Sequence, residues 1–308
     1  MTIPASNREE INPFLQLLLL LAYAFVGAIV FTVLAFIIIL ILYGLPILSN
    51  FQLLLSGDPK YLDGIKIMQI LSSIGMFVAP PIALAYTERY KPSGFFGLGK
   101  PKMQLLLLVL IIMAISMPFM EWTAVINQKM VLPEFLRGVE RWMKEKEAEA
   151  MRLTMQLIKA RSNLDFFVNL IMIAVLPAIG EELMFRGGLQ RSVNRIFGNH
   201  HAAIWLSAII FSAIHVQFYG FIPRMLLGAG FGYLYYFSGN LWYAILAHFL
   251  NNAYAVCIAF YMQKHNIPLD KAEDPIGFPW YGYLISAIIT IALFKLFKDT
   301  AQRERKLD

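Results

Sequence analysis

Runs of about twenty apolar residues recur along the chain, and they restrict its fold more than any other feature. The hydrocarbon core of a bilayer offers no water to pair with backbone N–H and C=O groups, so segments that cross it form helices. Of the 308 residues, 58% are hydrophobic and 15% are charged, whereas about 25% of a soluble domain is charged. We therefore expect an all-α, polytopic integral membrane protein that contacts the lipid bilayer.

Eight segments are apolar and long enough to predict about eight transmembrane helices. They cover approximately residues 14–42, 67–86, 103–125, 166–188, 202–218, 223–237, 241–262 and 280–297. Between the third and fourth, residues 134–167 combine charges of both signs with recurring Leu, Val, Met and Trp, a pattern typical of an amphipathic helix. The chain shows no internal repeat, so we expect one integral membrane domain, residues 1–308, with a motif-bearing core at about 163–262.

Charge predicts the orientation and the class of partner. Lysine and arginine are enriched after the second and fourth spans and at the C-terminus, which places both termini on the cytoplasmic side when eight spans are counted. The first apolar stretch is too long for a cleavable signal peptide and is expected to be an anchor. The formal net charge is +6, but the basic residues are dispersed, which favours contact with anionic lipid and no nucleic-acid partner.

Three predicted spans carry polar side chains that are costly in a membrane. An ionised side chain near the bilayer centre costs roughly 2.5–3.5 kcal/mol on insertion scales, so such residues are functional candidates. They occur in EELMFR of the fourth span, FSAIH of the fifth and HFLNN of the seventh, and are Glu181, Glu182, Arg186, His215, His248 and Asn252. The structural alternative is a self-neutralising ion pair together with hydrogen bonds between helices.

Helical spacing assigns different positions to the two carboxylates. Glu182 and Arg186 are four residues apart and share a face, which allows an internal ion pair. Glu181 points about 100° away from Glu182 and is left to face another group. His248 and Asn252 also share a face.

This set of side chains suits hydrolysis without a covalent nucleophile. The chain contains neither HExxH nor a GxSxG or GxSG serine motif. A carboxylate and imidazole, Glu181 and His215, suit activation of a water, while His248 and Asn252 suit stabilisation of an oxyanion. The same groups are ordinary zinc ligands, but no paired-ligand spacing supports a metal, so the pattern favours a site with no cofactor over a zinc site.

Three motifs, EExxxR, FxxxH and HxxxN, in this order within hydrophobic spans, resemble the CPBP family of CAAX-processing and bacteriocin-processing intramembrane endopeptidases. The resemblance covers roughly residues 163–259, and the first half of the chain matches only as further membrane helices. It implies that Glu181 and His215 activate a water. It also implies that His248 and Asn252 stabilise an oxyanion, and that Glu182 and Arg186 orient the site. No motif residue departs from the pattern.

The sequence therefore predicts a CAAX-protease-like, glutamic-type intramembrane endopeptidase acting on a membrane-associated peptide or protein, prenylated or not. With the resemblance, we expect it in a prokaryotic inner (plasma) membrane. Two alternatives stay open. A proton-coupled transporter would use Glu and His as a relay and would be favoured by inverted repeats, which the sequence does not show. A non-catalytic membrane binding protein of the immunity type would be favoured by loss of a motif residue.

The predicted depths of the motif residues disagree. Counted from the predicted cytoplasmic edges, Glu181 and His248 lie roughly 10 Å deep and His215 nearer 20 Å. For these side chains to meet, the fifth span would start deeper, so we expect residues 197–201 to dip into a water-filled cavity open to the cytoplasm.

Overall fold

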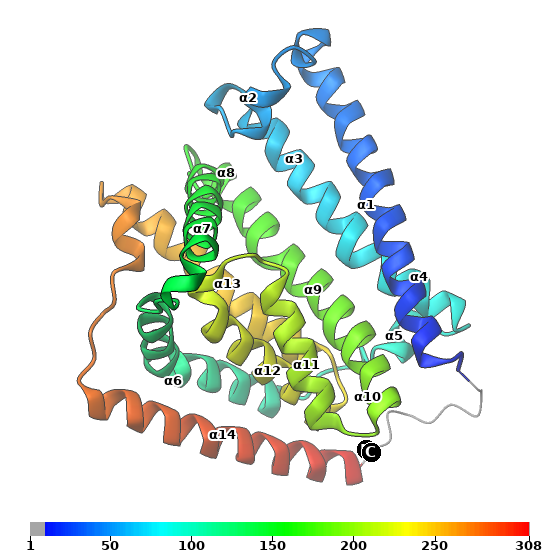
Figure 1. The fold of residues 1–308 in the computed structure, drawn as a ribbon. Helices are drawn as coiled ribbons and strands as arrows, with labels where there is room; N and C mark the ends of the chain where they lie inside the picture. Colours follow the sequence, from blue (N-terminus) through cyan, green and yellow to red (C-terminus); the bar gives the residue numbers. More distant parts are fainter. Residues whose placement is uncertain (1–9, 308) are drawn as a thin grey trace.

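The computed structural model describes residues 10–307, and these form helices without any strand (Figure 1). Residues 1–9, where the predicted cytoplasmic N-terminus falls, and 308 lie outside the described residues. The α-helices are α1 Pro13–Tyr43, α2 Phe51–Leu55, α3 Leu62–Ser73, α4 Ala79–Thr87, α5 Pro92–Phe95, α6 Met103–Gln128, α7 Arg137–Leu157, α8 Asn163–Asn169, α9 Leu176–Glu182, α10 Arg191–Phe197, α11 His200–Ala213, α12 Phe221–Ser238, α13 Trp242–Lys264 and α14 Trp280–Leu307. The prediction of an all-α fold is confirmed.

Six helical segments among the described residues are long and apolar enough to cross a membrane, which agrees with an integral membrane protein. They are Pro13–Tyr43, Pro59–Thr87, Met103–Gln128, Asn163–Phe197, Trp242–Lys264 and Trp280–Glu304. Large apolar side chains are exposed along α1, as expected for a surface that faces acyl chains.

The predicted count of eight spans is not confirmed, because the fifth and sixth candidates are shorter or less apolar than a full span. Helix α11 has 14 residues, or about 21 Å at the helical rise, against a hydrocarbon core of about 30 Å. Helix α12 has 18 residues and includes Arg224 and three glycines. The two helices pack against each other, and α12 also packs against α6, α13 and α14, so the pair lies against the longer helices of the bundle (Figure 1).

The turn between α10 and α11 corrects the predicted depths. Gly198 has a φ of 62°, in the left-handed region, and the side chain of Asn199 caps α11 by accepting from the backbone N–H groups of His201 and Ala202. The fourth segment therefore runs on to Phe197, well past the edge assumed from the sequence. Glu181 lies 16 residues before Phe197 and His215 lies 15 residues after His200, so both are roughly 23 Å from this turn. The difference in depth between Glu181 and His215, from which a water-filled cavity at residues 197–201 was inferred, is therefore absent.

Helix α7 is the predicted amphipathic helix. It lies between α6 and α8, outside the six long apolar segments, and buries Met143 and Leu157 while most of its other side chains are exposed. Its exposed face carries the i,i+4 ion pair Glu140–Lys144.

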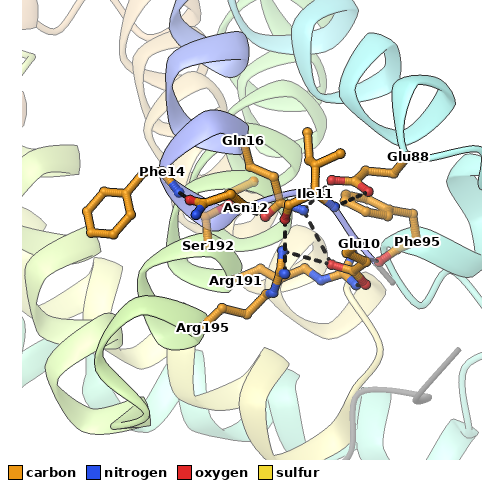
Figure 2. Close-up of polar contacts among 11 residues, drawn as sticks. Glu10, Ile11, Asn12, Phe14, Gln16, Glu88, Phe95, Arg191, Ser192 and Arg195 are labelled. Atoms are coloured by element: carbon orange, nitrogen blue, oxygen red, sulfur yellow. Dashed lines mark hydrogen bonds and ion pairs between the residues drawn. The ribbon is translucent and has the colours of Figure 1, made fainter. Parts of the chain in front are cut away.

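A polar network connects the start of α1 to α10 (Figure 2). Glu10 pairs with Arg191 and Arg195. Arg191 also donates to the carbonyl of Phe95 and lies 4.0 Å from the centre of its ring. The network therefore ties the first helix to the helix that carries the EELMFR motif.

Gln16 extends this network one turn further along α1 (Figure 2). Its side chain is fully buried, donates to Glu88 beyond the end of α4 and accepts from Ser192 of α10. A buried amide that is bonded on both sides fixes the relative positions of the three helices.

Candidate active site

The residues of the EELMFR motif lie on one continuous helix that spans α8, α9 and α10. Two π-helical segments, Leu170–Val175 and Leu183–Gln190, join the three α-helices. Pro177, which lacks a backbone N–H, is the second residue after the first segment. Wide π-type turns leave some carbonyls without the regular helical partner and are frequent at functional sites.

Glu182 is the centre of the polar cluster. Its side chain has an exposed fraction of 0%, and its Oε1 accepts from Nη1 of Arg186 at 2.7 Å. The same oxygen lies 2.8 Å from Nδ1 of His248. Its Oε2 has no hydrogen-bond partner among the described residues. A buried ion pair of this geometry holds both side chains in a single arrangement.

Arg186 is enclosed by helices α11 and α12. Its Nη2 donates to the carbonyl of Gly228 at 2.7 Å, and its guanidinium carbon lies 4.7 Å from the ring centre of Phe211 and 5.5 Å from that of Phe231. A Cβ at Gly228 would lie 3.2 Å from Nη2. The lack of a side chain at Gly228 therefore makes room for the guanidinium of Arg186.

His248 is oriented by a carboxylate and two aromatic rings. The ion-paired carboxylate of Glu182 can only accept, so Nδ1 of His248 carries a proton. The imidazole stacks on Phe231 at 5.3 Å between ring centres and meets Phe211 edge-on at 5.9 Å. Its other nitrogen, Nε2, lies 3.9 Å from Oε2 of Glu181. This separation is longer than a hydrogen bond.

Glu181 is held less tightly than its neighbour. Its side chain is 13% exposed, against 0% for Glu182. It has electrostatic interactions with His248 and with Arg224 of α12. The two adjacent carboxylates therefore occupy different environments, one locked in an ion pair and one next to an imidazole.

His215 follows the C-terminal end of α11. Its Nδ1 lies 2.7 Å from the carbonyl oxygen of Phe211, which can only accept, so the proton is on Nδ1 and the neutral ring has its lone pair on Nε2. Its ring also contacts the ring of Phe211 at 5.1 Å. Phe211 thus stands between His215 and His248, whose side chains interact electrostatically.

Asn252 lies one turn after His248 on α13. Its Nδ2 donates to the carbonyl of Ile173 in the first π-helical segment at 3.0 Å, and its Oδ1 accepts from Asn251. The second N–H of the amide is not used by these bonds. The structure therefore brings Glu181, Glu182, Arg186 and His248 into one cluster, with His215 across Phe211 and Asn252 on the same helix face as His248.

Several residues of the cluster escaped the sequence analysis. Phe231 and Gly228 have no polar side chain to mark them as part of a site. Arg224 did carry a signal, since it is an arginine in the first turn of an apolar helix, the kind of intramembrane charge that is functional by default.

Within the described residues, no group of three or more His, Cys, Asp or Glu side chains is placed to hold a metal ion.

Known proteins resemble the part of the chain that contains the cluster. Residues 163–254 match the family model described as type II CAAX prenyl endopeptidase Rce1-like, a range that contains all six motif residues. An uncharacterized protein of Bacillus subtilis (strain 168), YpbD, is 30% identical over 112 residues, which cover 35% of this chain and 53% of YpbD. The chain thus matches about half the length of this relative. No solved structure matches the chain significantly.

Proposed function

We propose that this protein, whose residues 163–254 match the Rce1-like family model of type II CAAX prenyl endopeptidases, is an intramembrane endopeptidase of glutamic type. The observation that supports this most is the division of labour between the adjacent carboxylates. Glu182 is locked to Arg186 and to Nδ1 of His248, while Glu181 faces Nε2 of the same ring at 3.9 Å. An ion pair that served only to neutralise Arg186 would need neither Glu181 nor His248.

In the proposed reaction, Glu181 and His215 activate one water. Nε2 of neutral His215 accepts one hydrogen bond from the water, and Glu181 takes the other proton. The water oxygen adds to the scissile carbonyl carbon. The C–N bond then breaks as the amine leaves with the proton that Glu181 received, which produces a carboxylic acid and an amine. The second water proton then passes from the acid to the amine, so the products are a carboxylate and an ammonium group.

His248 and Asn252 are proposed to stabilise the oxyanion of the tetrahedral intermediate. When His248 carries two protons, Nδ1 donates to Glu182 and Nε2 is a second donor. The free N–H of Asn252 would be the other donor, in an arrangement of fixed donors that needs no reorganisation. Glu182 and Arg186 act as positioning residues.

The proposed substrate is a membrane-associated peptide or protein, and the reaction as written requires no cofactor. The protein would reside in a prokaryotic inner membrane with both termini in the cytoplasm. This location follows from the basic loops and from the family resemblance.

The proposal is tested with the full chain in liposomes that contain an S-farnesyl peptide ending in a CAAX sequence. We expect cleavage that Glu181→Gln lowers by about 10²–10⁴-fold, detected by mass spectrometry of the products. Glu145→Gln, a change on exposed α7, is the matched control. Equal rates for wild type and Glu181→Gln would contradict the proposal, and an inert wild type would favour the non-catalytic binding protein.

A further inference from the structure

One cation beside the cluster has no function in the proposed reaction. Arg224 lies in the first turn of α12, four residues before Gly228 and seven before Phe231. This spacing places all three on one face of the helix. Gly228 contacts Arg186 and Phe231 stacks on His248, so this face of α12 is the one turned toward the polar cluster.

The level of Arg224 along the helix matches that of the two carboxylates. Arg186 bonds to the carbonyl of Gly228. One turn back from Arg186 is Glu182, and one turn back from Gly228 is Arg224. Because both helices run in the same direction from the α11–α12 connection toward the α10–α11 turn, Arg224 stands beside Glu181 and Glu182. Its electrostatic interaction with Glu181 agrees with this placement.

Among the residues that the structure describes, the guanidinium of Arg224 forms hydrogen bonds with Gln217, which is neutral. Nη2 donates to Oε1 of Gln217 at 2.5 Å, and Nη1 donates to the backbone carbonyl of the same residue at 3.4 Å. Among the described residues, its hydrogen bonds include no carboxylate, although Glu147 of α7 interacts with it at longer range. Arg186, by comparison, has its own carboxylate in Glu182.

A guanidinium that is held in place but has no bonded carboxylate is suited to bind an anion. Its charge persists at every physiological pH, and its planar fork matches a carboxylate through two parallel N–H···O bonds. Gln217 is the second residue after His215 and holds the fork in place without neutralising it. A partner carboxylate would therefore sit beside the water proposed between Glu181 and His215.

We propose that Arg224 is a specificity-determining residue that binds a carboxylate of the substrate next to the scissile bond. The carboxylate is either the C-terminal group of the peptide or an acidic side chain near the cleaved bond. This inference rests on the proposed endopeptidase function. It adds a reason for cleavage at one position of a peptide, since binding of the anion places the carbonyl carbon over the activated water.

The test compares three libraries of S-farnesyl peptides in mixed micelles with the full chain. The first has a free C-terminal carboxylate and no acidic side chain, the second has a C-terminal amide and no acidic side chain, and the third has the amide with one Asp or Glu after the farnesylated cysteine. Values of kcat/KM are measured for wild type, Arg224→Gln and Arg224→Lys. Arg152→Gln, an exposed arginine of α7, is the matched control.

For wild type and the control, we expect the first or the third library to be cleaved at least tenfold faster than the second, and which one it is identifies the source of the carboxylate. Arg224→Gln should bring this ratio close to one, mainly through KM. Arg224→Lys keeps the charge but loses the fork, so it should retain an intermediate ratio, and it tests the proposal even if Arg224→Gln does not fold.

A ratio near one in wild type, or an unchanged ratio in either Arg224 variant, would overturn the assignment of Arg224 while leaving the endopeptidase function intact. Absence of cleavage of every library by wild type would instead overturn the endopeptidase function, and this inference with it.

Discussion

His248 places its two ring nitrogens against two adjacent glutamates, with Nδ1 at 2.8 Å from Glu182 and Nε2 at 3.9 Å from Glu181. The shorter contact belongs to the carboxylate that is already paired with Arg186. Glu182 therefore orients the ring through Nδ1, whereas Nε2 remains available for a hydrogen bond to substrate. Neighbouring residues of identical chemistry acquire different functions because successive side chains point about 100° apart around a helix.

Replacement of the two glutamates should separate stability from activity. Glu182→Gln leaves a buried guanidinium without its counter-charge, which costs about 3–5 kcal/mol, so the thermal unfolding midpoint in detergent should fall markedly. Glu181→Gln should lower cleavage by about 10²–10⁴-fold with a much smaller change in the midpoint, because Glu181 has no ion-pair partner at hydrogen-bond distance among the described residues. Equal midpoints for the two variants would contradict this difference in environment.

The contact between Arg186 and Gly228 should be sensitive to a single methyl group. In Gly228→Ala, the new Cβ would stand 3.1 Å from the ring of Phe211 and 3.2 Å from Nη2 of Arg186, so we expect a lower unfolding midpoint and a lower kcat. Gly138→Ala is the control, since a Cβ there meets nothing within 4 Å. A Gly228→Ala protein as stable and active as the control would show that α12 can move away without consequence.

The network at the start of α1 should stabilise the helix that carries the motif. Glu10→Gln removes the charge that Arg191 contacts, and Arg191 is only 6% exposed. We expect a loss of about 1–3 kcal/mol, measured by chemical or thermal unfolding. Glu134→Gln removes the exposed pair with Arg137 and should have no measurable effect. Equal stability of both variants would argue against a stabilising function of the network.

Chelators should leave cleavage unchanged, because the proposed water is activated by Glu181 and His215 alone. The measurement is the initial rate of peptide cleavage before and after treatment with EDTA and 1,10-phenanthroline. Loss of activity that zinc restores would replace the proposed reaction by a metal-assisted one.

The membrane class and the six long helices follow from the sequence because a single physical requirement, apolar length, determines both. The α11–α12 pair did not follow from it. A short helix and a helix with an arginine in its first turn look like spans when only apolar runs are counted, and their packing against α6, α13 and α14 is a tertiary property.

The candidate site was predictable where helical spacing decides the geometry. The Glu182–Arg186 pair is an i,i+4 relation and needs only one helix. The contact of Glu182 with His248 joins residues 66 positions apart, and no spacing rule predicts it. The depth error had a specific cause, since the fourth helix was ended at residue 188, whereas it continues through a π-helical segment to Phe197.

The central claim is that Glu181 and His215 act on the same water, and a double-mutant cycle tests it most directly. Cleavage rates are measured for wild type, Glu181→Gln, His215→Asn and the double variant. His265→Asn is the control, because His265 also places Nδ1 on the carbonyl four residues earlier, at 2.9 Å from Tyr261, but in an exposed position. Each single variant should lose about 10²–10⁴-fold in kcat, and the double variant should lose no more than the worse single one, since groups that act as a unit are not additive. A double variant whose loss equals the product of the two single losses, or a His215→Asn protein as active as His265→Asn, would contradict the account.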